Sequence, residues 1–145
     1  MKKITLTIFT ILVASGWVLS ACSSQSTPAK LAGTSWTLVS YGPEGNQVPA
    51  ALGTETNLVF GMDGQVSGSL GCNSFSGDYK IKDGKLVFGL LASTLMACPE
   101  PQMKQEGAAF LVLTGTVRFN IEEDTLTIYD ANGANTLTLS GVINN

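Results

Sequence analysis

The chain has 145 residues and a formal net charge of −3, with eight basic side chains, eleven acidic side chains and no histidine. So few cations cannot neutralise a phosphate backbone, which argues against nucleic acid as a partner. The absence of histidine excludes Ser-His-Asp and Cys-His mechanisms, because no imidazole is available to take the proton of the nucleophile.

The N-terminal segment has the layout of a secretory signal. Two lysines precede an apolar stretch over residues 4–19, and small residues then lead to Cys22. This order of charged, apolar and cleavable parts is typical of exported proteins. Threonine, serine and glycine dilute the stretch, which falls short of the ~20 strongly apolar residues that a membrane-spanning helix needs. We therefore predict that residues 1–21 are a signal that is removed.

The four residues that end in Cys22 read Leu-Ser-Ala-Cys and resemble the lipobox of bacterial lipoproteins. In a lipobox the peptidase cuts before a cysteine whose thiol carries diacylglycerol, and further acyl chains such as palmitate give stable anchoring, since each buried methylene contributes about 0.8 kcal/mol. The alternative is an ordinary secretory signal that contains a cysteine. Ser23 resembles the residue found in lipoproteins that are sorted to the outer membrane. We therefore expect a lipid-anchored protein of the cell envelope, in the outer membrane and facing the periplasm.

The mature chain is predicted to be a tether followed by one domain. Residues 22–30 are mostly small and polar, which is the composition of a flexible, lipidated N-terminal tether. Residues 31–145 suit a single domain with one core. The removed signal holds two of the eight basic residues and no acidic residue, so the mature chain carries a formal charge of −5.

Alternating apolar residues predict an antiparallel β-meander. Asp63-Gly64 and Asp83-Gly84 are expected to form tight turns, because Asp-Gly supplies the positive φ values that such turns require. The predicted strands are Trp36–Val39, Asn57–Phe60, Val66–Leu70, Tyr79–Ile81, Leu86–Phe88, Val117–Ile121, Leu126–Tyr129 and Thr136–Leu139.

One segment lacks this alternation of apolar residues, and its sequence predicts a helix. Residues 99–106 begin with prolines and acids, as a first helical turn does, and Gly115 can end the helix. The apolar side chains expected to face the core are Met103, Phe110, Leu111 and Leu113. One helix packed on an antiparallel sheet or partly closed barrel gives a mostly β fold, that is, a β-rich α+β fold.

Cys72 and Cys98 are the two cysteines of the mature domain. Disulfides persist in the oxidising envelope, and a pair would close a separation of 26 residues. Two buried free thiols are an alternative. A metal site is another, although without histidine it would need carboxylates beside the two thiolates.

Three blocks of the sequence resemble the META domain family in the order in which they occur. They are Gly33–Trp36, Gly71–Tyr79 and Leu91–Pro99, the last followed by Glu106 and Phe110. The likeness covers nearly the whole mature chain. It implies a lipocalin-like half-barrel or small barrel with one packed helix, and no established enzymatic activity. We expect no cofactor.

The resemblance also bears on the cysteines and on the role. Cys72 and Cys98 both match the blocks of the family, which favours the disulfide. Members of the family are linked to heat shock, to antibiotic tolerance of the envelope and to virulence, and none of these links names a ligand.

Asn73 and the serines after it are candidate site residues. Asn73 can adopt left-handed backbone angles and bond nearby backbone, so its plain role is turn formation. Short polar loops on rigid β scaffolds also carry binding sites, which makes Asn73, Ser74 and Ser76 candidate ligand-binding residues.

Two further groups have plain structural interpretations. The acidic residues 122–124 lack the alternating ligand spacing of a calcium loop, so we expect a solvated turn and no metal. Aromatic side chains in a barrel of this size usually fill the interior. The aromatic residues expected in the core are Trp36, Phe60, Phe75, Tyr79, Phe88, Phe110 and Phe119.

The sequence thus predicts a non-enzymatic envelope lipoprotein. It would contact the membrane through the lipid on Cys22 and support stress or antibiotic resilience by binding a protein or a small apolar ligand. The alternative is an assembly factor that pilots an outer-membrane protein and uses an exposed strand edge as its template.

Overall fold

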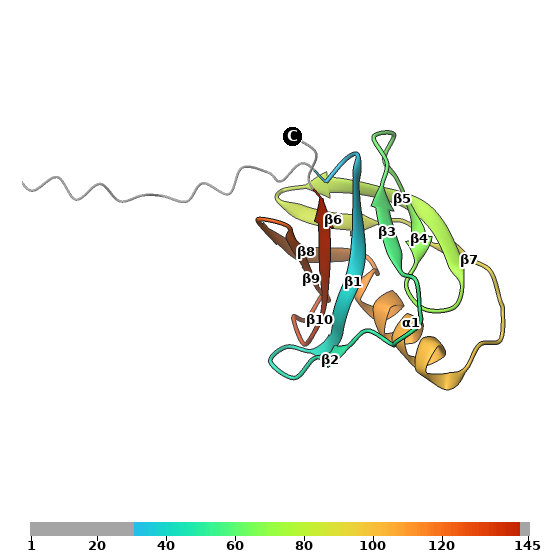
Figure 1. Cartoon of the computed structure of the whole chain (residues 1–145). Coiled ribbons are helices and arrows are strands. Elements are labelled where there is room, and N and C mark those ends of the chain that lie inside the picture. The colour runs from blue at the N-terminus through green and yellow to red at the C-terminus, as the bar shows by residue number, and fades with distance from the viewer. Residues whose placement is uncertain (1–30, 143–145) are drawn as a thin grey trace, which may run out of the picture.

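The computed structural model describes residues 31–142, and Figure 1 shows their arrangement. The signal over residues 1–21, the tether over residues 22–30 and Cys22 lie outside the described residues. The strands are β1 (Thr34–Pro43), β2 (Val48–Pro49), β3 (Asn57–Phe60), β4 (Gln65–Ser69), β5 (Ser74–Lys82), β6 (Lys85–Phe88), β7 (Ala92–Ser93), β8 (Thr116–Glu122), β9 (Thr125–Tyr129) and β10 (Asn135–Val142), and the helix is α1 (Glu100–Val112).

The strands form a closed antiparallel barrel. Strands β1, β3, β4, β5, β6, β8, β9 and β10 pair in this order, and β10 returns to pair with β1, which closes a ring of eight. The predicted mostly β fold is therefore confirmed, and of the two predicted forms the structure is the small barrel. Strands β2 and β7 are short additions that pair with β1 and β5.

Side chains fill the interior of the barrel. Buried residues alternate with exposed or half-buried residues along β1, β3 and β9, as the predicted period of two requires. Of the aromatic residues expected in the core, five are buried and the remaining two, Phe110 and Phe119, are half-buried against it. The predicted strands are all present, and most extend one or more residues beyond the predicted bounds.

Tight turns join the hairpins where the sequence predicts them. Asp83 and Gly84 have positive φ values of 51° and 71° between β5 and β6. Between β3 and β4, Gly64 has the positive value and Asp63 does not. The acidic residues 122–124 form the predicted turn between β8 and β9, where Glu123 has a φ of 53°.

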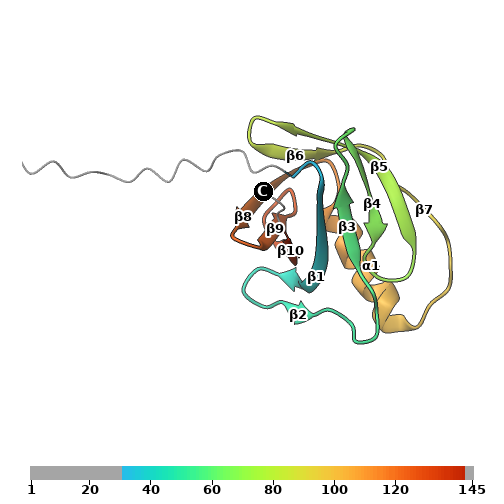
Figure 2. The ribbon, with the colours of Figure 1, turned by 45° about the horizontal axis from the view of Figure 1, so that its top comes forward.

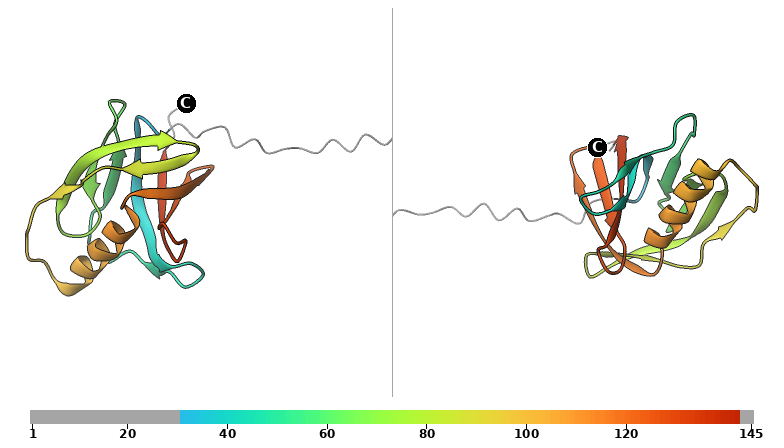
Figure 3. Two further views of the ribbon diagram at one scale, coloured as in Figure 1. Left: turned by 180° about the vertical axis from the view of Figure 1, so that it is seen from behind. Right: turned by 90° about the horizontal axis from the view of Figure 1, so that it is seen from below.

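Helix α1 lies at the end of the barrel opposite the entry of the chain (Figures 1 and 2). The backbone N–H of Gly33 bonds the carbonyl of Phe60 at the β3–β4 end, whereas Gln105 of α1 bonds the carbonyl of Leu70, past the other end of β4. Figure 3 shows the same arrangement from behind and from below. Among the described residues, no helix is long and apolar enough to cross a membrane.

The predicted apolar face of the helix is wrong in part. Met103 is 41% exposed and Leu111 is 71% exposed, whereas Phe110 is half-buried and Leu113 is buried. The buried residues within α1 are Gln105, Glu106, Ala109 and Val112. The helix therefore packs partly through polar side chains, and the reason is a set of hydrogen bonds to neighbouring loops.

Candidate functional site

The turn between β4 and β5 touches α1 directly. A Cβ atom on Gly71 would lie 2.4 Å from the backbone oxygen of Gln102 and 2.7 Å from the Cβ of Glu106. Real Cβ atoms do not approach that closely, so only glycine allows the turn and the helix to meet. This contact brings the backbone N–H groups after Gly71 within reach of the helix side chains.

The carboxylate of Glu106 accepts hydrogen bonds from these N–H groups. Its Oε2 accepts the backbone N–H of Cys72 at 2.8 Å and that of Asn73, and its Oε1 accepts the side-chain Nδ2 of Asn73 at 2.7 Å. The side chain is only 6% exposed. Three donors thus compensate the burial of the carboxylate, and both of its oxygens are occupied.

Asn73 links the helix to the segment after β7. Its Oδ1 accepts Thr94 Oγ1 at 2.8 Å and the backbone N–H of Met96 at 2.7 Å. Asn73 is 3% exposed and lies in the turn between β4 and β5, as expected, although its φ is not positive. Its side chain also joins three chain segments.

A disulfide lies next to these hydrogen bonds. Cys72 and Cys98 are bonded, with their Cα atoms 5.9 Å apart, as the resemblance favoured. No group of three or more metal-ligating side chains occurs among residues 31–142. The disulfide fixes the loop before α1 to the β4–β5 turn.

Gln105 completes the attachment of the helix. It is fully buried, its Nε2 donates to the carbonyl of Leu70 at 2.7 Å, and its Oε1 accepts the N–H of Ala51 at 2.6 Å. The corner cluster, as we call it, consists of Gly71, Cys72, Asn73, Thr94, Met96, Cys98, Gln105 and Glu106. Gln105 is not among the residues predicted from the sequence. The available signal was the weak apolar periodicity of residues 100–112, which leaves room for polar residues on the inner face.

Ser74 and Ser76 lie apart from Asn73. Both are exposed and alternate with buried Phe75 along β5, so they share the outer face of the barrel. Ser76 pairs with Ala92 of β7. The three candidate ligand-binding residues thus differ in exposure, because Asn73 is buried and the two serines face solvent.

Next to the corner cluster, several large apolar side chains face solvent. Leu90 and Leu95 are 97% and 96% exposed, Leu111 is 71% exposed, and Met96 and Met103 are also exposed. We call these five residues the apolar flank. All of them belong to residues 90–96 or to α1, and Asn73 bonds both of these segments through Met96 and Glu106.

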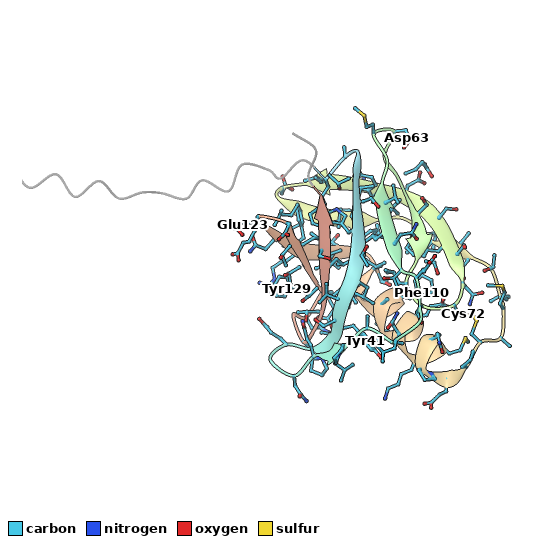
Figure 4. All side chains as sticks on the ribbon, in the orientation of Figure 1. Tyr41, Asp63, Cys72, Phe110, Glu123 and Tyr129 are labelled. Carbon is cyan, nitrogen blue, oxygen red and sulfur yellow. A yellow bond between two sulfur atoms is a disulfide. The ribbon has the colours of Figure 1, made fainter. Side chains whose placement is uncertain are left out.

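A groove runs between these segments. It has a volume of about 220 Å³ and opens to solvent. Its walls are the segment after β6 and the C-terminal end of α1, namely Gly89, Leu90, Leu91, Ser93, Phe110, Leu113 and Thr114. Figure 4 shows Cys72 and Phe110 on this side of the molecule, with Asp63 at the opposite end.

Comparisons with known proteins agree with this architecture. The family model of the META domain matches residues 29–141. An NMR structure of a protein from Burkholderia xenovorans is 30% identical, covers 81% of this chain and 90% of its own, and has a TM-score of 0.67. A second NMR structure is 29% identical, covers 79% of this chain and 93% of its own, and has a TM-score of 0.61.

A more distant structure shares the fold alone. The crystal structure of a DUF4847 family protein from Bacteroides vulgatus is 11% identical, covers 79% of this chain and 96% of its own, and has a TM-score of 0.57. No curated protein matches the chain.

Proposed function

The chain belongs to the META domain family, and from this premise we propose that it is a non-enzymatic binding protein of the bacterial envelope that holds a protein partner on its apolar flank. The observation that carries the proposal is the exposure of Leu90, Leu95 and Leu111, which belong to the segment after β6 and to α1. Exposed apolar patches on soluble domains mark interaction sites.

The filled barrel favours a protein partner over a small apolar ligand. Among residues 31–142, twenty hydrophobic side chains are buried in one core, including Trp36, Phe60 and Phe75. A lipocalin-like ligand site would need a cavity of at least 300 Å³ in that interior. The apolar surface that remains free is on the outside, where a protein can reach it.

The chemistry of the corner cluster supports a binding role without catalysis. Cys72 and Cys98 are joined in a disulfide, so neither offers the thiolate that a nucleophile requires. Both oxygens of Glu106 already accept hydrogen bonds. These groups hold the apolar flank in place.

The location is part of the proposal. The lipobox at Cys22 and the residue after it support a lipid anchor in the outer membrane, and the disulfide suits the oxidising envelope. A Cys22→Ala variant is expected in the soluble fraction after cell disruption. Retention of the variant in the membrane pellet would contradict the anchor. Support of stress or antibiotic resilience, as in the heat-shock-associated members of the family, is the cellular role we propose.

In-cell crosslinking tests the binding surface. We expect a photoreactive amino acid at Met103 to give a defined adduct, and the double substitution Leu95→Ser and Leu111→Ser to abolish it. The matched control is Val39→Ser with Ile81→Ser, which removes two exposed apolar side chains elsewhere and should leave the adduct unchanged. An equal loss in both double variants would contradict a role for the apolar flank.

The second candidate function is the assembly factor that uses a strand edge. The observation that favours it is β7, which has a strand partner on one side only among the described residues.

A further inference from the structure

Strands β6 and β7 form one broken strand along β5, with a bulge between them. Phe88 pairs with Tyr79 and Ala92 pairs with Ser76, so one extra residue lies on the β6–β7 side. Gly77 faces this bulge, because a Cβ there would lie 2.6 Å from the carbonyl oxygen of Leu90. The bulge turns Leu90 out to solvent and redirects the chain that follows.

The outer edge of this broken strand is open after Phe88. Strand β8 pairs with β6 at Leu86 and Val87, and the N–H of Phe88 bonds the carbonyl of Gly115. The chain before Gly115 is α1, so β8 does not continue along β7. Within residues 31–142, β7 pairs only with β5.

The backbone groups of β7 alternate in direction. The N–H of Thr94 donates to the carbonyl of Ser74 on β5. Successive N–H groups of a strand point to opposite sides, so the N–H of Ser93 points away from β5. That side is the groove.

The groove places an apolar wall beside this edge. Phe110 lines it and is held by an edge-to-face contact with Phe75, with ring centroids 5.4 Å apart. Leu113 and Leu91 also line it, and none of the lining residues that the structure describes is charged. A charged side chain of a ligand would lose its water there without gaining a partner, so an uncharged side chain is the complement.

We propose that this groove binds an extended segment of an incompletely folded envelope protein, which adds as a strand to the open edge of β7. Main-chain hydrogen bonds to the edge would hold the segment, and uncharged apolar side chains at every second position would enter the groove beside Phe110. The inference rests on the proposed function, binding of a protein partner, and it uses the β7 edge of the second candidate to name the chemical form of that partner.

Other occupants fit the groove less well. Seven residues line it, whereas a stable interface between folded proteins uses about 20–30 residues on each side, so a second folded copy has too little surface here. The N-terminal segment joins the barrel at Leu31, at the opposite end from α1. The wall of the groove that α1 provides therefore lies away from the point where the described chain begins.

Peptide binding to the lipidated mature protein in phospholipid nanodiscs tests the proposal. The probe is a fluorescent six-residue peptide that alternates valine and threonine, and its twin carries N-methyl groups on the backbone. We expect the N-methylated twin to bind about tenfold more weakly or worse, as measured by fluorescence anisotropy, because strand addition needs its backbone donors. Equal binding of the two peptides would overturn the proposal, as would no binding of the unmodified peptide.

Two pairs of protein variants locate the site. Ser93→Pro removes the outward N–H of β7, and Ser93→Ala keeps it, so only the first should weaken binding about tenfold. Thr114→Lys places a charge at the rim of the groove and should weaken binding, whereas Thr37→Lys on β1 should not. If Ser93→Pro and Thr114→Lys both bind like the parent protein, the groove is not the site.

The outcomes separate this inference from the proposed function. The Met103 adduct can depend on Leu95 and Leu111 while Ser93→Pro and Thr114→Lys leave peptide binding unchanged. In that case the apolar flank binds a partner in another form, and the strand-addition inference is wrong. If the peptide binds as expected and the adduct is absent, the proposed role of the flank falls instead. If the peptide binds only to the lipid, and nanodiscs without the protein bind it equally well, the groove is not the binding site.

Discussion

Asn73 and Glu106 are joined by two hydrogen bonds that use both oxygens of the carboxylate. One is the Nδ2–Oε1 contact of 2.7 Å, and the other runs from the backbone N–H of Asn73 to Oε2. The side-chain amide of Asn73 cannot exchange the positions of its Oδ1 and Nδ2 atoms, because Oδ1 accepts hydrogen bonds from Thr94 and Met96.

Glu106→Gln is expected to lower the free energy of unfolding by about 2 kcal/mol or more. An amide in place of the carboxylate must direct its NH2 group at a donor, either Asn73 Nδ2 or the two backbone N–H groups. Urea denaturation followed by circular dichroism measures the change. Glu100→Gln, on the exposed first turn of the same helix, is the matched control and should cost less than about 0.5 kcal/mol. Similar losses in the two variants would refute this account of the corner cluster.

The disulfide should account for a large part of the stability. Closing 26 residues corresponds to roughly 3.5 kcal/mol in the chain-entropy model. We expect the double variant Cys72→Ala, Cys98→Ala to lose about that much free energy of unfolding and therefore to unfold at a lower urea concentration. A thiol assay on the unfolded, unreduced mature protein should find neither cysteine free, and two free thiols would contradict the bond.

Two glycines near the helix should respond in opposite directions to alanine. Gly71→Ala forces the β4–β5 turn and α1 apart and should cost about 1–3 kcal/mol. Gly107 lies within α1 with no atom within 4 Å of an added Cβ, so Gly107→Ala should stabilise by about 0.5–1 kcal/mol. Thermal unfolding of both variants checks the pair, and a stabilising Gly71→Ala would show that the turn does not need glycine.

The stability of the barrel should decrease at high pH through Tyr79. Burial and the nearby Asp63 carboxylate raise the pKa of Tyr79 above its ordinary value of 10.0. The unfolded chain loses this proton first, so the stabilisation is complete below pH 10 and is lost as the pH rises through the folded pKa.

Tyr79→Phe should remove that part of the pH dependence. At neutral pH it should cost about 1 kcal/mol, because the hydroxyl donates to the carbonyl of Gly61 at 2.9 Å. Urea denaturation at a series of pH values measures both effects. A variant with the same alkaline loss of stability as the parent would exclude Tyr79 as its source.

The alternation of apolar residues was enough to predict the strands, because a two-sided sheet imposes that pattern locally. Trp36 and Leu38 on β1, and Leu126 and Ile128 on β9, are buried as the pattern requires. The closure of the barrel could not be derived in this way. It depends on the pairing of β1 with β10, which are far apart in the sequence, and the choice between a half-barrel and a closed barrel stayed open until the structure was known.

The corner cluster shows where local reasoning fails. A search for an apolar helix face selects Met103 and Leu111, which are exposed, and passes over Gln105 and Glu106, which are buried. The inward polar side chains are stable because loops from elsewhere in the chain supply their hydrogen-bond partners. The sequence around Gln105 and Glu106 does not indicate those partners, because they are distant along the chain. The exposed loop residues Leu90 and Leu95 were likewise beyond prediction, since their exposure follows from a bulge and a disulfide.

The pairing of β1 with β10 also sets the order in which the molecule can be completed. Eight residue pairs join the two strands, from Ser35 with Val142 to Pro43 with Asn135. A chain that emerges from a ribosome or an export channel with its N-terminus first releases β1 long before β10. During that interval the edge of β1 that pairs with β10 lacks its partner, and contacts between such distant segments form slowly, in milliseconds to seconds. The ring therefore closes as a late step, and the unfinished barrel is the form that needs protection from aggregation.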